Sequence, residues 1–169
     1  EETVESFVAG CDFIVDEIDV FPLEAHYILH KVCRKHNIPV YSAYVVGLGV
    51  HFYKFQGEDF KFEYFFKYTA EMKDAEIFDE VVEKIVSPTP PYLEGKNLLE
   101  FKKTSLNFGV PIFGPSCLLG HSIVVTRILC DFLGEEILGT KIKKTPIMPN
   151  FIKIDLSTLE ISTETHIKK

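Results

Sequence analysis

The chain has 169 residues, an apolar content of 46% and a formal net charge of −7 at pH 7. That length suits one domain with a single core, and the negative charge argues against a surface that binds nucleic-acid phosphates. The four cysteines form no C-x-x-C pair, so no zinc site is expected. Each lies in an apolar context typical of a free buried thiol, and the cytoplasm is the simplest compartment.

The first third of the chain predicts a short helix at residues 3–8, followed by a strand–acidic turn–helix–strand unit. The strand covers residues 12–16, the helix residues 22–36 and the second strand residues 38–46. Ligands in open α/β folds sit at the carboxyl ends of strands. Asp16 and Asp19, in the turn after the first strand, therefore stand where a metal–nucleotide site could form.

The rest of the chain predicts a strand, an irregular aromatic segment, a helix, a loop with a short helix at its start, a long helix and a terminal hairpin. In chain order these are residues 51–55, 60–68, 75–86, 98–115, 116–133 and 151–163. The long helix is apolar nearly all round, which predicts a central position, and Gly134 ends it. Because His121, Arg127 and Asp131 interrupt this stretch, a buried helix is expected and a membrane span is not.

Several blocks in this order resemble the carboxyl-terminal half of the ThiF/MoeB/HesA superfamily, adenylating enzymes related to ubiquitin-activating enzymes. The blocks are Asp16-Glu17-Ile18-Asp19, the helix 22–36, Ile38-Pro39-Val40, Gly47-Leu48-Gly49, residues 114–120 with their helix, and the strand 151–155. Residues 59–66 and the long helix are more similar to a divergent bacterial branch of ThiF-like proteins. The resemblance implies an α/β, Rossmann-like fold with a mixed sheet and flanking helices. It also implies that residues 1–169 form one domain that is a fragment of a larger adenylating domain.

The family activates a carboxylate with ATP and magnesium and releases pyrophosphate. The resemblance thus implies a substrate that is the carboxyl terminus of a ubiquitin-like or sulfur-carrier protein, or a small carboxylate. Asp19 matches the family's magnesium- and ATP-proximal Asp, and carboxylate oxygen is the ligand that magnesium prefers; its alternative role is to cap the helix 22–36. Asp16 is the second candidate for the ATP site, and its alternative role is a hydrogen bond to the adjacent turn. The expected partners are a second copy or the missing amino-terminal half, and a carrier protein.

The sequence departs from the family pattern at several positions. Val20 replaces the family's Asn, and Glu24 or His26 falls where the family has an Arg. Neither substitute has arginine's permanent charge and planar fork. The family's G-x-G-x-x-G loop is missing, since Gly47-Leu48-Gly49 precedes a strand and has no third Gly. This chain alone is therefore expected to be inactive. The alternatives are a non-catalytic module that dimerises and binds a carrier protein, and an unrelated doubly wound nucleotide-binding domain.

No catalytic residue is assigned, although two kinds of side chain were candidates. Cys117, at a helix start, is the best candidate for a low-pKa thiol, and its alternative is a packed cysteine. His26 and His30 have the i,i+4 spacing of zinc ligands. The H-E-x-x-H motif is absent, which favours a partly exposed helix face. His121 is interpreted as a satisfied core histidine and not as a catalytic base.

Overall fold

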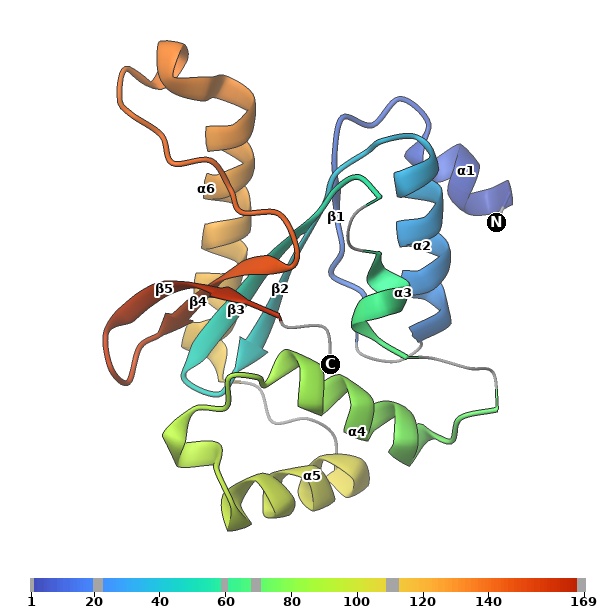
Figure 1. Cartoon of the computed structure of the whole chain (residues 1–169), viewed down its shortest axis with the longest axis vertical. Helices are drawn as coiled ribbons and strands as arrows, with labels where there is room; N and C mark the ends of the chain where they lie inside the picture. The colour runs from blue at the N-terminus through green and yellow to red at the C-terminus, as the bar shows by residue number, and fades with distance from the viewer. Residues whose placement is uncertain (1, 20–22, 59–60, 68–70, 109–112, 167–169) are drawn as a thin grey trace.

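The computed structural model describes residues 2–19, 23–58, 61–67, 71–108 and 113–166 (Figure 1). It has the α/β fold that the sequence predicts. The described elements are α1 (Glu2–Val8), β1 (Ile14–Val15), α2 (Leu23–Lys35), β2 (Val40–Val46), β3 (Gly49–Phe55), α3 (Phe62–Phe65), α4 (Asp74–Ile85), the 3-10 turn η1 (Pro91–Leu93), α5 (Lys96–Phe108), α6 (Gly114–Leu138), β4 (Asn150–Asp155) and β5 (Glu160–Thr165).

The five strands form one sheet in the order β1-β2-β3-β4-β5. β1 and β2 run parallel, with Ile14 opposite Val40, and the other three neighbouring pairs are antiparallel. This confirms the predicted mixed sheet. A doubly wound domain has a mostly parallel sheet, so the alternative of an unrelated doubly wound domain does not fit this topology.

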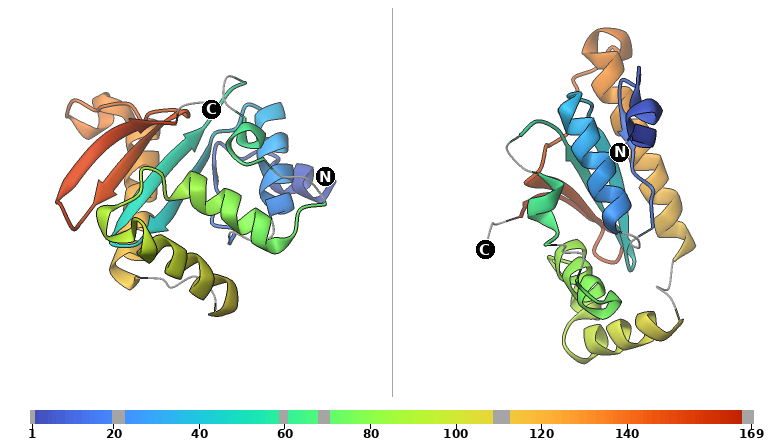
Figure 2. Two further views of the ribbon diagram at one scale, coloured as in Figure 1. Left: turned by 60° about the horizontal axis from the view of Figure 1, so that its bottom comes forward. Right: turned by 90° about the vertical axis from the view of Figure 1, so that its right-hand side faces the viewer.

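The sheet carries a hydrophobic core on each face, because successive side chains of a strand point to opposite sides. On one face Val40, Val46, Tyr53 and Phe55 join the larger core with α2, α3 and α4. On the other face a smaller core holds only four buried residues, namely Tyr41, Phe52, Val124 and Ile128. Figure 2 shows the resulting layers, with α2 and α6 on either side of the strands. The predicted flanking helices are therefore confirmed.

Helix α6 lies on the outside of the sheet, so the prediction of a central, buried helix is wrong. Its buried residues form a stripe with a spacing of four, namely Ser116, Gly120, Val124 and Ile128. At Gly120 an added Cβ would lie 3.6 Å from the Ala43 side chain, so this helix approaches the sheet closely. The opposite side of the helix exposes large apolar side chains, namely Leu118, Val125 and Leu129. The sequence showed the apolar content of this helix but not whether a partner covers both sides.

By length and composition α6 is also the one helix among the described residues that could cross a membrane, and 17% of its apolar window is buried. It packs along β2 and β3. An open sheet edge cannot be satisfied in hydrocarbon, which argues against a span. As predicted, the straight helix breaks at Gly134, where φ is 68°.

Two further expectations differ from the structure. Residues 98–115 were predicted to be mostly loop, but α5 is a helix of 13 residues. Its sequence offers no strong capping signal, and Leu98 and Phe101 pack against the larger core, so tertiary contacts stabilise it. The aromatic segment 60–68 contains the single-turn helix α3, although residues 59–60 and 68–70 lie outside the described part. The terminal hairpin is confirmed as β4 and β5.

Candidate functional site

A pocket of about 420 Å³ opens at the carboxyl ends of the parallel strands β1 and β2. Its walls come from the acidic turn after β1, the second half of β2, helices α4 and α5, and the first turns of α6. The α4 wall is apolar. Polar groups come from the other walls, namely Glu17, Asp19, Tyr44, Cys117 and His121. The pocket therefore occupies the place where ligands bind in open α/β folds.

Asp19 lines this pocket and is exposed, as the sequence led us to expect of a strand-end carboxylate. Its alternative role as a helix cap involves residues 20–22, which lie outside the described residues, and so does Val20. Glu24 is exposed on α2 and is not part of the pocket lining. Carboxylate oxygens of Asp19 and Glu17 are the ligand type that magnesium prefers, so the residues present fit that ion.

Glu17 and His121 face each other at the pocket wall, with Glu17 Oε2 3.6 Å from His121 Nε2. The His121 ring donates from Nδ1 to the backbone oxygen of Cys117 at 2.8 Å. The His121 side chain is 65% exposed, so its interpretation as a core histidine is wrong. Burial raises the pKa of the Glu17 carboxyl and the Asp16 carboxylate adds to this, while His121 acts against it. This wall thus offers a carboxyl group and an imidazole to a ligand.

No Lys or Arg lines this pocket within the part of the chain that the structure describes. Phosphate groups are usually bound by arginine or lysine, or by backbone N–H groups in glycine-rich loops. The pocket therefore supplies carboxylates for a metal but no side-chain cation for a triphosphate. Cys117 is a partly buried free thiol in the pocket wall.

Asp16 lies beneath the pocket and does not line it. Its side chain is buried, and Oδ1 accepts a hydrogen bond of 3.1 Å from the backbone N–H of Ile18. Oδ2 lies 2.7 Å from His26 Nδ1 and 2.9 Å from His30 Nε2. The Ile18 bond is the structural bond to the turn that was the alternative role of Asp16. A direct contact between Asp16 and a ligand in the pocket is not supported by this position.

The pKa values of the two histidines shift in opposite directions because their surroundings differ. His26 also bonds through Nε2 to the backbone oxygen of Asp19, at 3.0 Å, so both ring nitrogens face acceptors. Burial lowers the pKa of His26, but the bond to Asp16 outweighs it and the pKa is raised. For His30 burial dominates and lowers the pKa. Burial would raise the pKa of Asp16, but both histidines lower it below its usual range.

The prediction that His26 and His30 lie on a partly exposed face is wrong, since their exposures are 1% and 3%. The signal was present in the spacing of α2. Leu23, His26, His30 and Cys33 recur every three or four residues, and all four are buried. Because histidine is polar, the two histidines were not counted as part of a buried stripe. No local pattern could place Asp16 opposite it, because the pairing depends on how β1 packs against α2.

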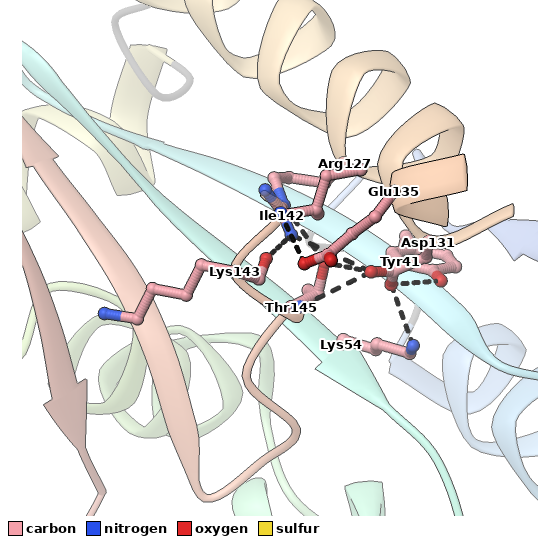
Figure 3. Close-up of polar contacts among 8 residues, drawn as sticks. All are labelled: Tyr41, Lys54, Arg127, Asp131, Glu135, Ile142, Lys143 and Thr145. Atoms are coloured by element: carbon pink, nitrogen blue, oxygen red, sulfur yellow. Dashed lines mark hydrogen bonds and ion pairs between the residues drawn. The ribbon is translucent and has the colours of Figure 1, made fainter. Parts of the chain in front are cut away.

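A second polar cluster lies near the far end of α6, on the other face of the sheet (Figure 3). Asp131 accepts hydrogen bonds from Tyr41 Oη at 2.9 Å, Lys54 Nζ at 2.9 Å and Thr145 Oγ1 at 2.8 Å. Arg127 donates from Nε to Thr145 Oγ1 at 3.0 Å. Burial would raise the pKa of Asp131, but Lys54, Thr145 and Tyr41 lower it. This cluster attaches α6 to β2, β3 and the segment before β4.

No protein-family model matches the sequence, and no curated protein matches it. Among solved structures, Escherichia coli MccB with succinimide is 14% identical, with a TM-score of 0.56, and the match covers 98% of this chain and 39% of MccB. MccB with MccA-N7isoASN is 15% identical, with a TM-score of 0.57, and 100% of this chain covers 42% of it. PaaA is 16% identical, with a TM-score of 0.51 and coverages of 97% and 45%.

These identities support a shared fold and nothing finer, and this chain spans less than half the length of each matched structure. The match runs along nearly the whole chain, including the turn that carries Asp16 and Asp19. The chain therefore has an α/β fold that resembles the ThiF-like fold of MccB.

Proposed function

We propose that this chain forms one wall of the substrate site in a protein that activates a carboxylate with ATP. The observation that carries the proposal is the place of Asp19, which lines a pocket of about 420 Å³ at the carboxyl ends of the only parallel strand pair in the described sheet. The chain has the fold of MccB, a ThiF/MoeB-like adenylating enzyme. Since it covers 39–42% of MccB, the nucleotide-binding remainder would come from outside this chain.

The pocket suits the carboxylate partner better than the nucleotide. Val81, Val82 and Ile85 of α4 form an apolar wall that would pack against the aliphatic part of a substrate and exclude water. The absence of Lys and Arg from the described lining leaves the triphosphate to groups supplied elsewhere. The substrate class would be the carboxyl terminus of a carrier protein or a small carboxylate.

When bound, ATP would supply the adenylyl group that the substrate carboxylate oxygen accepts, with pyrophosphate as the leaving group. Asp19 would hold the magnesium ion, for which one or two carboxylates with water and phosphate suffice. The contribution of this chain would be positioning, since its apolar wall would hold the aliphatic part of the substrate and keep water away.

ATP–pyrophosphate exchange tests this proposal. The protein that carries this chain, with its nucleotide-binding half, is incubated with labelled pyrophosphate and ATP. Small carrier proteins and small carboxylates are then added one at a time. We expect exchange that needs magnesium and one of these substrates. Exchange with none of the carriers or carboxylates would contradict adenylation.

A second candidate function is a non-catalytic module that dimerises and binds a carrier protein. The same lack of a phosphate-binding cation favours it, and so does the exposed apolar side of α6. A carrier that binds the protein with unchanged affinity in the absence of ATP, and without exchange, would favour this module over the enzyme.

The cytoplasm remains the proposed compartment. All four cysteines are free, which is usual where thiols are kept reduced.

A further inference from the structure

We propose that Asp16, His26 and His30 form a buried site for one zinc ion. One donor atom from each residue lies within 4.8 Å of the others. The histidines stand one turn apart on α2, and Asp16 follows the end of β1. In the sequence only the i,i+4 spacing of His26 and His30 hints at such a site, because the third ligand comes from another element. This inference does not depend on the proposed function.

Each donor is already oriented by a further hydrogen bond or ring contact, as is usual around protein metal ions. His26 donates its other ring N–H to the backbone oxygen of Asp19 at 3.0 Å, which turns Nδ1 toward Asp16. The backbone N–H of Ile18 holds Asp16 Oδ1 at 3.1 Å, which leaves Oδ2 for the two rings. The His30 ring stacks on Phe62, with centroids 4.1 Å apart.

The distances from Asp16 to the two rings need only a small adjustment to accept the ion. Oδ2 lies 2.7 Å from His26 Nδ1 and 2.9 Å from His30 Nε2. Ligands about 2.0–2.1 Å from a tetrahedral zinc ion are about 3.3 Å apart. Outward movements of about half an ångström at Asp16 would therefore make room for the metal. The two ring nitrogens, which lie within 4.8 Å of each other, would approach each other, and the outer bonds to Asp19 and Ile18 would stay.

The donor set favours a transition metal over magnesium. Two imidazole nitrogens and one carboxylate oxygen suit zinc, whereas magnesium prefers oxygen ligands throughout. A zinc ion with three protein ligands usually takes a water molecule as its fourth ligand. The thiol of Cys33 is buried on the same side of α2 but is not one of the three grouped donors. The ion would fasten α2 to the acidic turn and so hold Asp19 in place.

Metal titration of the intact protein tests the site. The protein is stripped with a chelator, and zinc is then added in competition with a chromophoric chelator. We expect one tightly bound zinc per chain and a rise in the melting temperature on adding zinc. Cobalt(II) in place of zinc should give the visible absorption of a four-coordinate ion, without the sulfur-to-cobalt band that a Cys33 ligand would produce.

Variants locate the site. His30→Gln and Asp16→Asn should each lower zinc affinity at least about tenfold, because each removes a residue that would coordinate the ion directly. His51→Asn is the matched control, because His51 is also buried and lies outside the group, and it should bind zinc like the unchanged protein. If a ligand variant fails to fold, the cobalt spectrum of the unchanged protein still decides. No stoichiometric zinc binding by the stripped protein, or equal binding by His30→Gln, would overturn the proposal in favour of a metal-free hydrogen-bonded cluster.

Discussion

The ring of His26 bonds through Nε2 to the backbone oxygen of Asp19 over 3.0 Å, and this contact attaches helix α2 to the wall of the pocket. The other nitrogen of the same ring lies 2.7 Å from Asp16. A buried polar cluster thus supports the residue that faces the pocket. The position of Asp19 depends on side chains that do not themselves line the pocket.

Replacing Asp16 tests how much this cluster contributes to stability. Asp16→Asn removes the charged acceptor of two buried hydrogen bonds from His26 and His30, so we expect a loss of about 3–5 kcal/mol in the free energy of unfolding. Urea unfolding with a chelator present measures the metal-free value. Asp12→Asn, on an exposed residue four positions earlier, should change it by less than about 0.5 kcal/mol. A loss below about 1 kcal/mol for Asp16→Asn would show that the cluster is not an ion pair.

His51 predicts a pH dependence. Burial is the main cause that lowers its pKa to about 4, and Lys153 and His166 add to this shift. The bond from Nδ1 to the Ile85 backbone oxygen and the Glu164 carboxylate oppose it. The unfolded value is about 6.5. Because the unfolded chain binds the proton more readily than the fold does, protonation of this histidine favours unfolding. Its contribution to stability is therefore fully present above pH 6.5 and is lost as the pH falls toward 4. The loss from this residue should be on the order of 3 kcal/mol.

Unfolding free energies measured between pH 7 and pH 4 check this expectation. Asn can keep the donor to Ile85 but does not titrate in this range. In His51→Asn the unfolding free energy should therefore fall less steeply as the pH is lowered, by the slope that corresponds to about one fewer proton taken up on unfolding. Identical slopes for the two proteins would mean that His51 is charged or exposed in the fold.

The Asp131 cluster should stabilise the attachment of α6. In Asp131→Asn the side chain of Lys54, 12% exposed, loses its carboxylate, so we expect a loss of about 1.5–3 kcal/mol in urea unfolding. Asp79→Asn is the control, because Asp79 pairs with Lys102 at 2.8 Å but its side chain is 58% exposed. That pair should be worth less than about 1 kcal/mol. Equal losses in the two variants would contradict a special role for the Asp131 cluster.

The exposed side of α6 should associate with a second copy of the protein. Its side chains include Val125 at 58% exposure and Leu118 at 71%, and apolar patches of this kind usually mark an interface. Light scattering after size exclusion should show a dimer that Val125→Glu disrupts. Leu159→Glu, at an 86% exposed position in the β4–β5 turn, should leave the dimer intact. A monomer in the unchanged protein would instead mean that another part of a larger domain, or another partner, covers this side.

Local patterns in the sequence were enough to predict most elements of the fold. The Gly134 break and the terminal hairpin depend on residues close in the chain, and the structure confirms them. Helix α5 was missed because packing by Leu98 and Phe101 stabilises it, not strong local signals. The predicted central position of α6 was wrong, because apolar composition does not say which side of a helix packs against the sheet.

The candidate site was predicted only in part. The sequence placed Asp19 in the turn after a strand, which is a local feature; the structure finds it in the lining of the pocket, and its role there stays a prediction. The cluster of Asp16 with His26 and His30 was missed, since it depends on contacts between residues 10 and 14 positions apart. The pocket-facing position of His121 was missed as well, because exposure of a helix face depends on its neighbours.

In the proposed function, the Asp19 carboxylate holds magnesium at a carboxylate-activating site. Its most direct test is ATP–pyrophosphate exchange by Asp19→Asn, compared with Asp12→Asn, over a range of magnesium concentrations. We expect Asp19→Asn to lower exchange at least about 100-fold at limiting magnesium, equivalent to roughly 3 kcal/mol, with Asp12→Asn near the unchanged rate. Unchanged exchange and an unchanged magnesium requirement in Asp19→Asn would contradict the claim.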